Sequence, residues 1–286
     1  HLLARAHGAG VRHLVLATSY KAELFEPVFG DGSALGLELN YVTEDVPLGT
    51  GGALRNVTDR LRSGPDEPVL IFNADILSGH DIGTQLALHR SVDADATLYL
   101  TEVSDARAFG CVPTDSTGRI TAFLEKMPEP ITNQINAGCY VFRRRVLDEI
   151  PAGQVVSIER ETFPALLARG ARLQGYLDSS YWLDVGTPAA LVRGSADLVL
   201  GRAPSPAVPP VDGEALVLAG AKVAVDGKVS GGSCVGAGAV VGAGAHIDGS
   251  VLFDGAVVEE GTVVRASIVG ARARIGREQL HADVLQ

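Results

Sequence analysis

Aliphatic residues recur at every sixth position over the last quarter of the chain, with glycine and alanine filling many of the positions between them. This period is typical of a parallel β-helix, in which each short strand places one aliphatic side chain inside a triangular coil. A flexible Gly/Ala linker is the alternative, but seven positions in one register argue against it. The first series is Val217, Val223, Val229, Val235, Val241, Ile247 and Phe253, and the second, after a slip, is Val251, Val257, Val263, Val269 and Ile275.

The pattern predicts a left-handed parallel β-helix of hexapeptide repeats over residues 214–286. The period is lost from residue 277 on, so we expect the end of the chain to be a cap, a tail or a truncation. Coil ends and aliphatic flanks need cover. We therefore expect this part of the chain to mediate homo-oligomer formation.

The first two thirds of the chain show a different pattern, in which strand-like and helix-like segments alternate. Such alternation is the signature of βαβ units and predicts an α/β fold with a mainly parallel sheet. Between residues 109 and 184 the order is less regular, which we interpret as an insertion that builds one wall of a pocket. The strand-like runs are 13–18, 37–43, 68–72 and 96–103, and the helix-like stretches lie near 1–8, 20–29, 51–62, 81–91 and 188–200.

A proline-rich segment separates the two patterns. It reads GRAPSPAVPPVDG over residues 201–213, and its four prolines exclude a helix or a central strand. We therefore predict an α/β domain over residues 1–200, a linker over 201–213 and the β-helix domain over 214–286.

The net charge and the cysteine content limit the functions that this protein could have. The net charge of -10 argues against a nucleic-acid-binding surface, and an anionic substrate would need local cations or a metal. Cys111, Cys139 and Cys234 lie far apart in apolar contexts, which indicates reduced, buried thiols in a cytoplasmic protein. No apolar stretch is long enough to span a membrane. The chain opens at His1 inside a helix-like pattern, so we expect an amino-terminal segment to be missing from this sequence.

Two carboxylates follow apolar runs at positions where ligands of α/β sheets bind. Asp75 comes just beyond the continuous apolar run 69–72, together with Asn73, and ligands of such sheets lie outside the carboxyl ends of the strands. Asp184 follows Trp182 and Leu183 before a turn into a helix. Each aspartate alone could be a helix cap or a turn residue. Together they could form the oxygen-rich site that Mg²⁺ accepts.

Two further segments carry ligand-binding signals. YVTEDVPLGTGGAL ends a strand with Glu44 and then presents Gly49, Gly51 and Gly52 at the start of a helix, which is either a tight turn or a loop for a closely approaching ligand. FLEKMPEPITNQINAGCYVF places Glu125 beside Lys126, a pair that could hold a polyhydroxyl ligand bearing phosphate or be a solvated surface pair.

These motifs, in this order, resemble those of the sugar-nucleotide pyrophosphorylases, and most closely the mannose-1-phosphate guanylyltransferases. The matching segments are LGTGGAL, FNADIL, FGCVPTDSTGRITAFLEK, NAGCYVF and YWLDVGTP, followed by the hexapeptide repeats. The resemblance implies a Rossmann-like nucleotidyltransferase domain that joins a sugar 1-phosphate to a nucleoside triphosphate and uses Mg²⁺. The expected substrates are mannose 1-phosphate and GTP.

The resemblance also implies roles for individual residues. Asp75 and Asp184 hold the metal, and Lys126 binds the sugar phosphate. The nucleotide is contacted by Leu48, Gly49, Thr50, Gly52 and Asn73, and the sugar by Gly110, Glu125, Asn136 and Gly138. The family's amino-terminal strand and its Gly-rich loop with Arg and Lys, which grips the triphosphate, have no counterpart in this sequence.

Three alternatives remain open at this stage. Within the same enzyme class, the product could come from glucose 1-phosphate with a thymidine or uridine nucleotide. The chain could also be a non-catalytic regulatory subunit, because pyrophosphorylase-like domains fused to hexapeptide repeats occur as sensors and scaffolds. A hexapeptide acyltransferase would use a solenoid histidine as base, and His246 is the candidate.

Overall fold

The computed structural model describes residues 1–276, which divide into two compact units. The α/β unit contains residues 2–74 and 80–180. The solenoid unit contains residue 1, the short segment 75–79 and residues 181–276. Residues 201–213 contain no helix or strand. The cap, tail or truncation expected from residue 277 on lies outside the described residues, and the domain boundaries drawn from the sequence stay a prediction.

The α/β unit contains a four-stranded sheet in the order β3-β6-β5-β7 and a separate parallel pair, β1 and β2. In the larger sheet β5 and β7 are parallel, and β6 runs antiparallel to both β3 and β5. The fold class is therefore the expected α/β class, but strand β6 runs in the opposite direction to its neighbours. The strands are β1 (His13–Thr18), β2 (Glu38–Thr43), β3 (Pro68–Phe72), β5 (Ala96–Glu102), β6 (Gln134–Arg143) and β7 (Leu173–Leu177).

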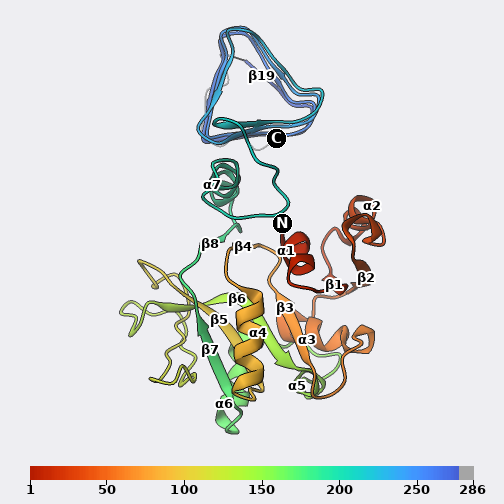
Figure 1. Cartoon of the computed structure of the whole chain (residues 1–286), viewed down its shortest axis with the longest axis vertical. Helices are drawn as coiled ribbons and strands as arrows, with labels where there is room; N and C mark the ends of the chain where they lie inside the picture. Colours follow the sequence, from red (N-terminus) through yellow and green to blue (C-terminus); the bar gives the residue numbers. More distant parts are fainter. Residues whose placement is uncertain (277–286) are drawn as a thin grey trace. The chain divides into compact units, whose positions relative to one another are not determined.

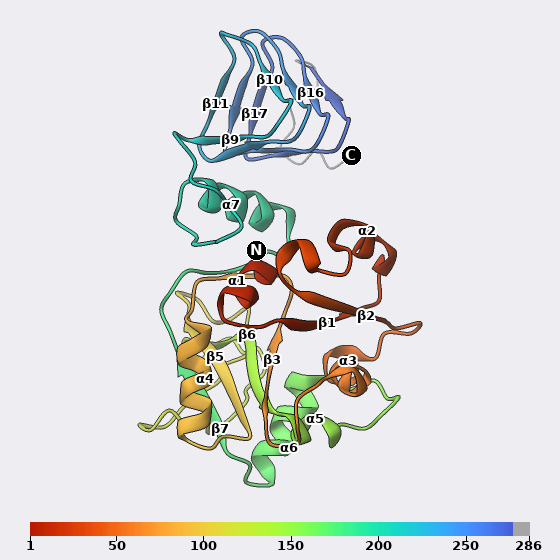
Figure 2. The ribbon, with the colours of Figure 1, turned by 45° about the vertical axis from the view of Figure 1, so that its right-hand side comes forward.

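Helices cover both faces of this sheet, with α4 on one face and α3, α5 and α6 on the other (Figure 2). On the second face Leu98, Tyr140, Phe142 and Phe163 form an almost fully buried core. The helices are α1 (Leu2–Gly8), α2 (Glu26–Phe29), α3 (Gly49–Asn56), α4 (Ile82–Ser91), α5 (Arg144–Asp148) and α6 (Phe163–Ala168), with 3-10 turns η1 (Ala22–Leu24), η2 (Ser33–Leu35) and η3 (Thr58–Arg60) and a π-turn, η4 (Ile158–Thr162).

The face beneath α4 contains two buried histidines. His80 is 2% exposed and stacks on Tyr99 with ring centroids 3.9 Å apart, and His89 is 5% exposed with its Nδ1 2.9 Å from Thr97 Oγ1. Burial lowers the pKa of each imidazole to about 4, with a further contribution from Arg5 at His80 and from Arg143 at His89. Both rings are therefore neutral in the folded protein at pH 7.

We expect the folded protein to lose stability as the pH falls from 6.5 to 4. In that window the histidines of the unfolded chain have ordinary pKa values and bind protons that the folded chain does not bind. The free energy of unfolding therefore decreases as the pH decreases. The slope is about 1.4 kcal/mol per pH unit at most for His80 and smaller for the less buried His89. Urea unfolding at several pH values measures it. The double variant His80→Phe, His89→Gln should flatten the profile, and an unchanged slope would contradict this assignment.

The solenoid unit forms a triangular coil with three parallel sheets (Figure 1). Val235 pairs with Val217, eighteen residues earlier, and with Leu252, seventeen residues later. The strands are β9 (Ala215–Val217), β10 (Lys222–Val223), β11 (Lys228–Ser230), β12 (Ser233–Val235), β13 (Val240–Val241), β14 (His246–Asp248), β15 (Val251–Leu252), β16 (Val257–Val258), β17 (Val263–Arg265), β18 (Ile268–Val269) and β19 (Arg274–Ile275).

The predicted interior series is right from Val223 to Ile247 and wrong at Phe253, which is 44% exposed. Its first member, Val217, pairs with the interior Val235 but is itself 46% exposed. The corner between β14 and β15 is one residue shorter than the corner between β11 and β12, so Leu252 takes the interior position. The second series is wrong at Val251, Val257 and Val263 and correct only at its last two members. The interior residues of the later coils are Leu252, Val258, Val264, Val269 and Ile275.

The outer face of one solenoid sheet is also apolar, because helix α7 (Pro188–Val199) covers it. Val192 of α7 packs against Val251 and Ile268. At Gly232 an added Cβ would lie 2.7 Å from the backbone of Ala196, so the helix and the coil meet without room for a side chain. The short antiparallel pair β4 (Ile76–Ser78) and β8 (Trp182–Asp184) completes this unit.

The corrected register predicts different costs for two neighbouring substitutions. Leu252→Ala should reduce the free energy of unfolding by about 2–5 kcal/mol, because it leaves a cavity inside the coil. Phe253→Ala should cost much less, since that ring is half in solvent. Equilibrium unfolding of the two variants tests the register, and a larger loss for Phe253→Ala would contradict it.

Candidate active site

Asp75 and Asp184 lie side by side within the solenoid unit. Ile76 pairs with Asp184 across the β4–β8 ladder, and the Val185 N–H donates to the Asp75 carbonyl oxygen at 2.9 Å. The Asp184 carboxylate accepts a hydrogen bond from the Gly186 N–H at 2.9 Å, which orients it. Both aspartates are exposed, so their carboxylates are open to solvent and to ligands.

This donor set fits Mg²⁺. Neither carboxylate forms an ion pair with another described residue, and among the described residues no group of three or more His, Cys, Asp or Glu side chains could enclose a metal. Mg²⁺ does not need such a cage, because it is usually bound by one or two carboxylates together with waters and ligand phosphates.

The predicted nucleotide-binding loop lies in the α/β unit, where it packs against residues 154–156. The Gly51 and Gly52 N–H groups both donate to the Val156 carbonyl oxygen, at 2.8 and 3.2 Å, and the Val156 N–H donates to the Leu48 carbonyl oxygen. A Cβ on Gly52 would lie 2.5 Å from the Gln154 carbonyl oxygen. This close packing explains why glycine is required there, and it leaves the N–H groups of Gly51 and Gly52 engaged within the protein.

One segment, residues 154–162, links the predicted nucleotide-binding and sugar-binding residues. The Ile158 N–H donates to Oγ1 of Thr50, one of the predicted nucleotide-binding residues, at 3.0 Å. The Asn136 side-chain amide donates to Glu159 at 3.0 Å, and Arg160 forms a 3.3 Å ion pair with Glu125. The segment ends in the π-turn η4, a conformation found frequently at functional sites.

Asn136 is fixed by three hydrogen bonds. Its amide nitrogen also donates to the Tyr140 hydroxyl at 2.8 Å, and its oxygen accepts from the Gly138 N–H at 3.1 Å. The Asn73 N–H donates to the Gly138 carbonyl oxygen at 2.8 Å, which places Asn73 beside the same segment of β6. The structure therefore brings Asn73, Asn136 and Gly138 together at one end of the sheet.

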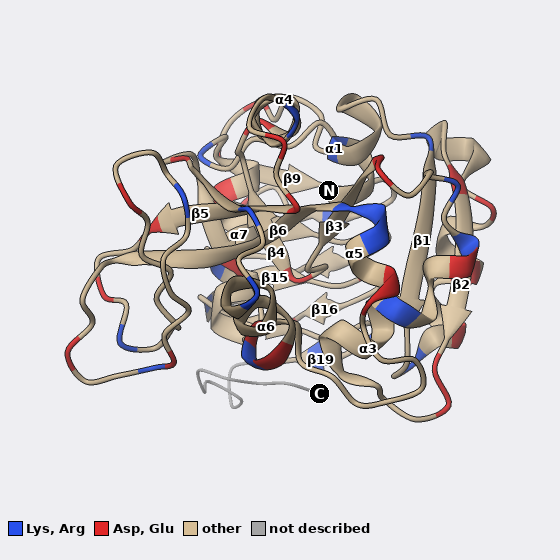
Figure 3. Ribbon diagram, turned by 90° about the horizontal axis from the view of Figure 1, so that it is seen from below, with Lys and Arg blue, Asp and Glu red and all other residues tan. Residues whose placement is uncertain are grey.

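Gly110, Glu125 and Lys126 lie on the long connection between β5 and β6. Figure 3 shows this connection as loops that project beyond β5, with acidic and basic residues along them. The Cys111 N–H donates to the Leu124 carbonyl oxygen at 2.9 Å, so Gly110 and Glu125 flank one pairing of the chain. Glu125 and Lys126 are exposed. Cys111 and Cys139 are buried thiols, while Cys234 is only partly buried.

No role was predicted for Glu159 and Arg160, although both contact predicted sugar-site residues. Their only signal is a pair of charges just before an apolar helical segment, which is common on protein surfaces. Glu44 is a third omission: its Oε2 accepts a hydrogen bond from the Leu48 N–H at 3.2 Å.

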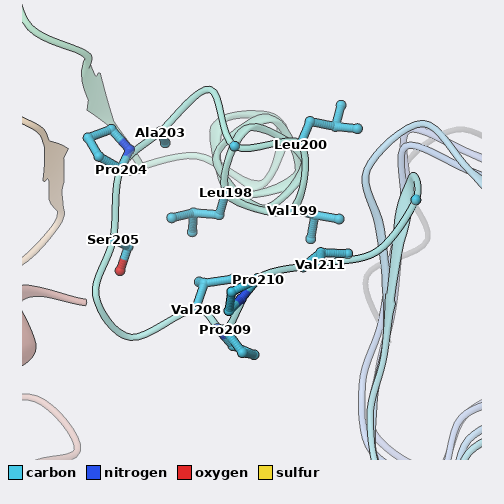
Figure 4. A pocket seen from close by; sticks show the side chains of 12 residues that line it. Leu198, Val199, Leu200, Ala203, Pro204, Ser205, Val208, Pro209, Pro210 and Val211 are labelled. Atoms are coloured by element: carbon cyan, nitrogen blue, oxygen red, sulfur yellow. The ribbon is translucent and has the colours of Figure 1, made fainter.

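Two other features of the solenoid unit offer less chemistry. A cavity of about 390 Å³ lies between the end of α7 and the proline-rich segment, and its lining contains no charged side chain (Figure 4). His246 lies 3.3 Å from Ser230 Oγ, which donates to Asp248. The hydroxyl contacts both groups, and no aspartate of the described chain accepts a hydrogen bond from the imidazole. This is therefore not the Ser–His–Asp arrangement that activates a nucleophile. Among the described residues, no helix is long and apolar enough to cross a membrane.

Comparison with protein families gives two matches that together cover most of the chain. A family model described as nucleotidyl transferase matches residues 1–199, and one described as the GMPPB C-terminal domain matches residues 211–282.

Among curated proteins, the mannose-1-phosphate guanylyltransferase of Mycobacterium tuberculosis is 58% identical over 225 residues, which are 78% of this chain and 62% of that protein. The mannose-1-phosphate guanylyltransferase catalytic subunit beta of Drosophila pseudoobscura is 34% identical over 195 residues, 68% of this chain and 52% of that protein. The chain thus spans between half and two thirds of the length of these relatives.

Solved structures show the same fold at low sequence identity. HddC from Yersinia pseudotuberculosis superposes with a TM-score of 0.57 at 22% identity, covering 67% of this chain and 81% of HddC. A second structure of HddC, complexed with GMP-PN, gives a TM-score of 0.56 over 67% of this chain and 83% of HddC, again at 22% identity.

Proposed function

The chain belongs to the nucleotidyl transferase family, and we propose that it forms GDP-mannose and pyrophosphate from GTP and mannose 1-phosphate. The observation that carries the proposal is the similarity to the mycobacterial mannose-1-phosphate guanylyltransferase, which extends over most of this chain. The match of the solenoid to the GMPPB C-terminal domain supports the same subgroup.

The chemistry of this reaction is limited by charge repulsion. An oxygen of the sugar phosphate must attack the α-phosphate of the nucleotide in line while pyrophosphate leaves, and both reactants are anionic. Mg²⁺, held by Asp75 and Asp184, would neutralise charge on the nucleotide phosphates. The ammonium of Lys126 binds and orients the incoming sugar phosphate as a point charge. No covalent nucleophile is needed.

The other predicted residues bind the two substrates. Leu48, Gly49, Thr50 and Gly52 contact the nucleotide base, with Asn73 beside it. Gly110, Glu125, Asn136 and Gly138 line the sugar pocket, where Glu125 accepts hydrogen bonds from sugar hydroxyls. The hydrogen bonds between segment 154–162 and both groups support a shared binding region within the α/β unit.

We also propose that the solenoid mediates self-association. Val217 occupies an interior position in register with Val235, yet it is 46% exposed, because no further coil precedes it in the described chain. Leu218 beside it is 40% exposed. An apolar coil end with free strand edges is a surface that a second copy could cover.

The reverse reaction tests the proposed substrates. Radiolabelled pyrophosphate and Mg²⁺ are supplied with GDP-mannose, GDP-glucose, UDP-glucose or dTDP-glucose, and labelled nucleoside triphosphate is measured. The proposal predicts labelled GTP, formed fastest from GDP-mannose. Preference for UDP-glucose or dTDP-glucose would replace the proposed reaction by a uridylyl or thymidylyl transfer to glucose 1-phosphate. No labelled nucleoside triphosphate from any of the sugar nucleotides would favour a non-catalytic subunit.

A further inference from the structure

The Tyr140 hydroxyl is a buried polar group next to the predicted sugar-binding residues. Tyr140 is 1% exposed, and its ring meets Phe163 edge-on with the ring centroids 5.3 Å apart. The hydroxyl accepts a hydrogen bond from the Asn136 side-chain amide at 2.8 Å, and the Asn73 side chain hydrogen-bonds the same hydroxyl. Packing and hydrogen bonds therefore leave this phenol little freedom to move.

The backbone of β6 brings the hydroxyl within reach of Asn136. The two residues are four positions apart on this strand, and Gly138 lies midway between them without a side chain of its own. Gly138 has a φ of +77°, a conformation that suits glycine, and its N–H donates to Asn136 Oδ1 at 3.1 Å. The absence of a side chain at residue 138 allows the phenol to reach the amide.

The protein itself uses all but one of the hydrogen-bonding positions of the Asn136 amide. The amide nitrogen has two N–H donors, of which one goes to the Tyr140 hydroxyl and the other to Glu159 Oε1. The amide oxygen can accept two hydrogen bonds, and it receives one from the Gly138 N–H. Asn136 is partly exposed, so the remaining acceptor position can receive a hydrogen bond from a ligand. A sugar hydroxyl is a donor of this kind.

Of the two groups that accept the Asn136 N–H donors, Tyr140 is the more firmly fixed. Glu159 is exposed, so its carboxylate can exchange this hydrogen bond for one with water at little cost. Tyr140 is shielded from water. Burial raises the pKa of Tyr140, with a further contribution from the Glu159 carboxylate, so the phenol stays neutral at pH 7. The orientation of the amide therefore depends mainly on Tyr140.

We propose that Tyr140 is a positioning residue, whose hydroxyl holds the Asn136 amide so that its oxygen is available to a hydroxyl group of the sugar. The inference rests on the proposed function and deepens it by naming a residue that sets the affinity for the sugar phosphate, although it is too buried to touch the substrate. Without the phenol hydroxyl, the amide can rotate and present an N–H group where an oxygen is needed.

The test compares Tyr140→Phe with Tyr99→Phe, which removes the same atom from an equally buried ring on the face beneath α4. The KM for mannose 1-phosphate and kcat are measured at saturating GTP and Mg²⁺, and the unfolding midpoint is recorded in parallel. The same measurements are made for the wild-type chain, Asn136→Ala and the double variant that combines Asn136→Ala with Tyr140→Phe.

Tyr140→Phe should raise the KM for mannose 1-phosphate about 3- to 10-fold, which corresponds to one lost hydrogen bond, and should change kcat little. Tyr99→Phe should leave the KM unchanged. In the Asn136→Ala background, Tyr140→Phe should have no further effect on the KM, because the hydroxyl acts through the Asn136 amide.

Three results would overturn the inference while leaving the proposed function standing. They are an unchanged KM in Tyr140→Phe, an equal rise in Tyr99→Phe, and effects of Tyr140→Phe and Asn136→Ala that add in the double variant. Failure of the wild-type chain to turn over GTP and mannose 1-phosphate would overturn the proposed function and the inference together.

Discussion

Asp75→Asn and Asp184→Asn should each lower the turnover of the nucleotidyl transfer by roughly 10²- to 10³-fold, with little loss of stability. Asparagine has nearly the same shape and can still accept the hydrogen bond that the Gly186 N–H gives to Asp184. The substitution removes the charge that would hold Mg²⁺. Because both side chains are exposed, neither change disturbs a buried contact.

Turnover of these variants is measured at saturating GTP and mannose 1-phosphate over a range of Mg²⁺ concentrations, with the unfolding midpoint recorded in parallel. The matched control is Asp226→Asn, an exposed carboxylate of the solenoid to which we assign no role. It should leave turnover unchanged. Turnover near the wild-type value in Asp75→Asn or Asp184→Asn would contradict the metal assignment.

Phe163→Ala should reduce the free energy of unfolding by about 3–5 kcal/mol. Phe163 is fully buried and stacks on Phe142 and Phe123 with ring centroids 5.6 and 5.1 Å away, while Tyr140 meets it edge-on at 5.3 Å. It directly follows the π-turn η4, so it also anchors the segment that links the two predicted substrate sites. Removing the ring leaves a cavity between the sheet and this segment.

Urea unfolding followed by circular dichroism measures the loss. Phe123→Ala is the control, because Phe123 stacks on the same ring from a partly exposed position. Its cost should be clearly smaller. A loss below about 1 kcal/mol for Phe163→Ala would mean that this aromatic cluster does not stabilise the core as the structure indicates.

The regular elements of the chain could be predicted because one physical pattern governs each of them. The apolar run 69–72 becomes β3, and the strand-like runs 13–18 and 96–103 become β1 and β5. The reversed direction of β6 could not be predicted in this way, because strand direction depends on the path of the preceding chain. The predicted helix near 20–29 divides into two short pieces, η1 and α2.

The solenoid register shows where periodicity fails. Val251 and Leu252 are both apolar and both buried, one against α7 and the other inside the coil. A helix that covers the outer face of a sheet makes both faces apolar, so the sequence pattern no longer distinguishes them. A corner shortened by one residue then shifts the register without leaving a signal in composition.

Candidate site residues could be chosen from the sequence where a motif follows a strand. They could not be chosen where an irregular segment makes the contacts. Asp75 and Asp184 could be chosen because each follows an apolar run before a turn. Segment 154–162 has no period, and its contacts with Thr50, Asn136 and Glu125 join residues far apart in the sequence.

The measurement that tests the central claim most directly is pyrophosphate release in the forward reaction. The full-length protein is assayed with Mg²⁺ and every pairing of GTP, UTP, dTTP and ATP with mannose 1-phosphate and glucose 1-phosphate. We predict rapid release with GTP and mannose 1-phosphate and much slower release with every other pair. Preference for a different pair, or no release in any pairing from the folded protein, would contradict the assignment as a mannose-1-phosphate guanylyltransferase.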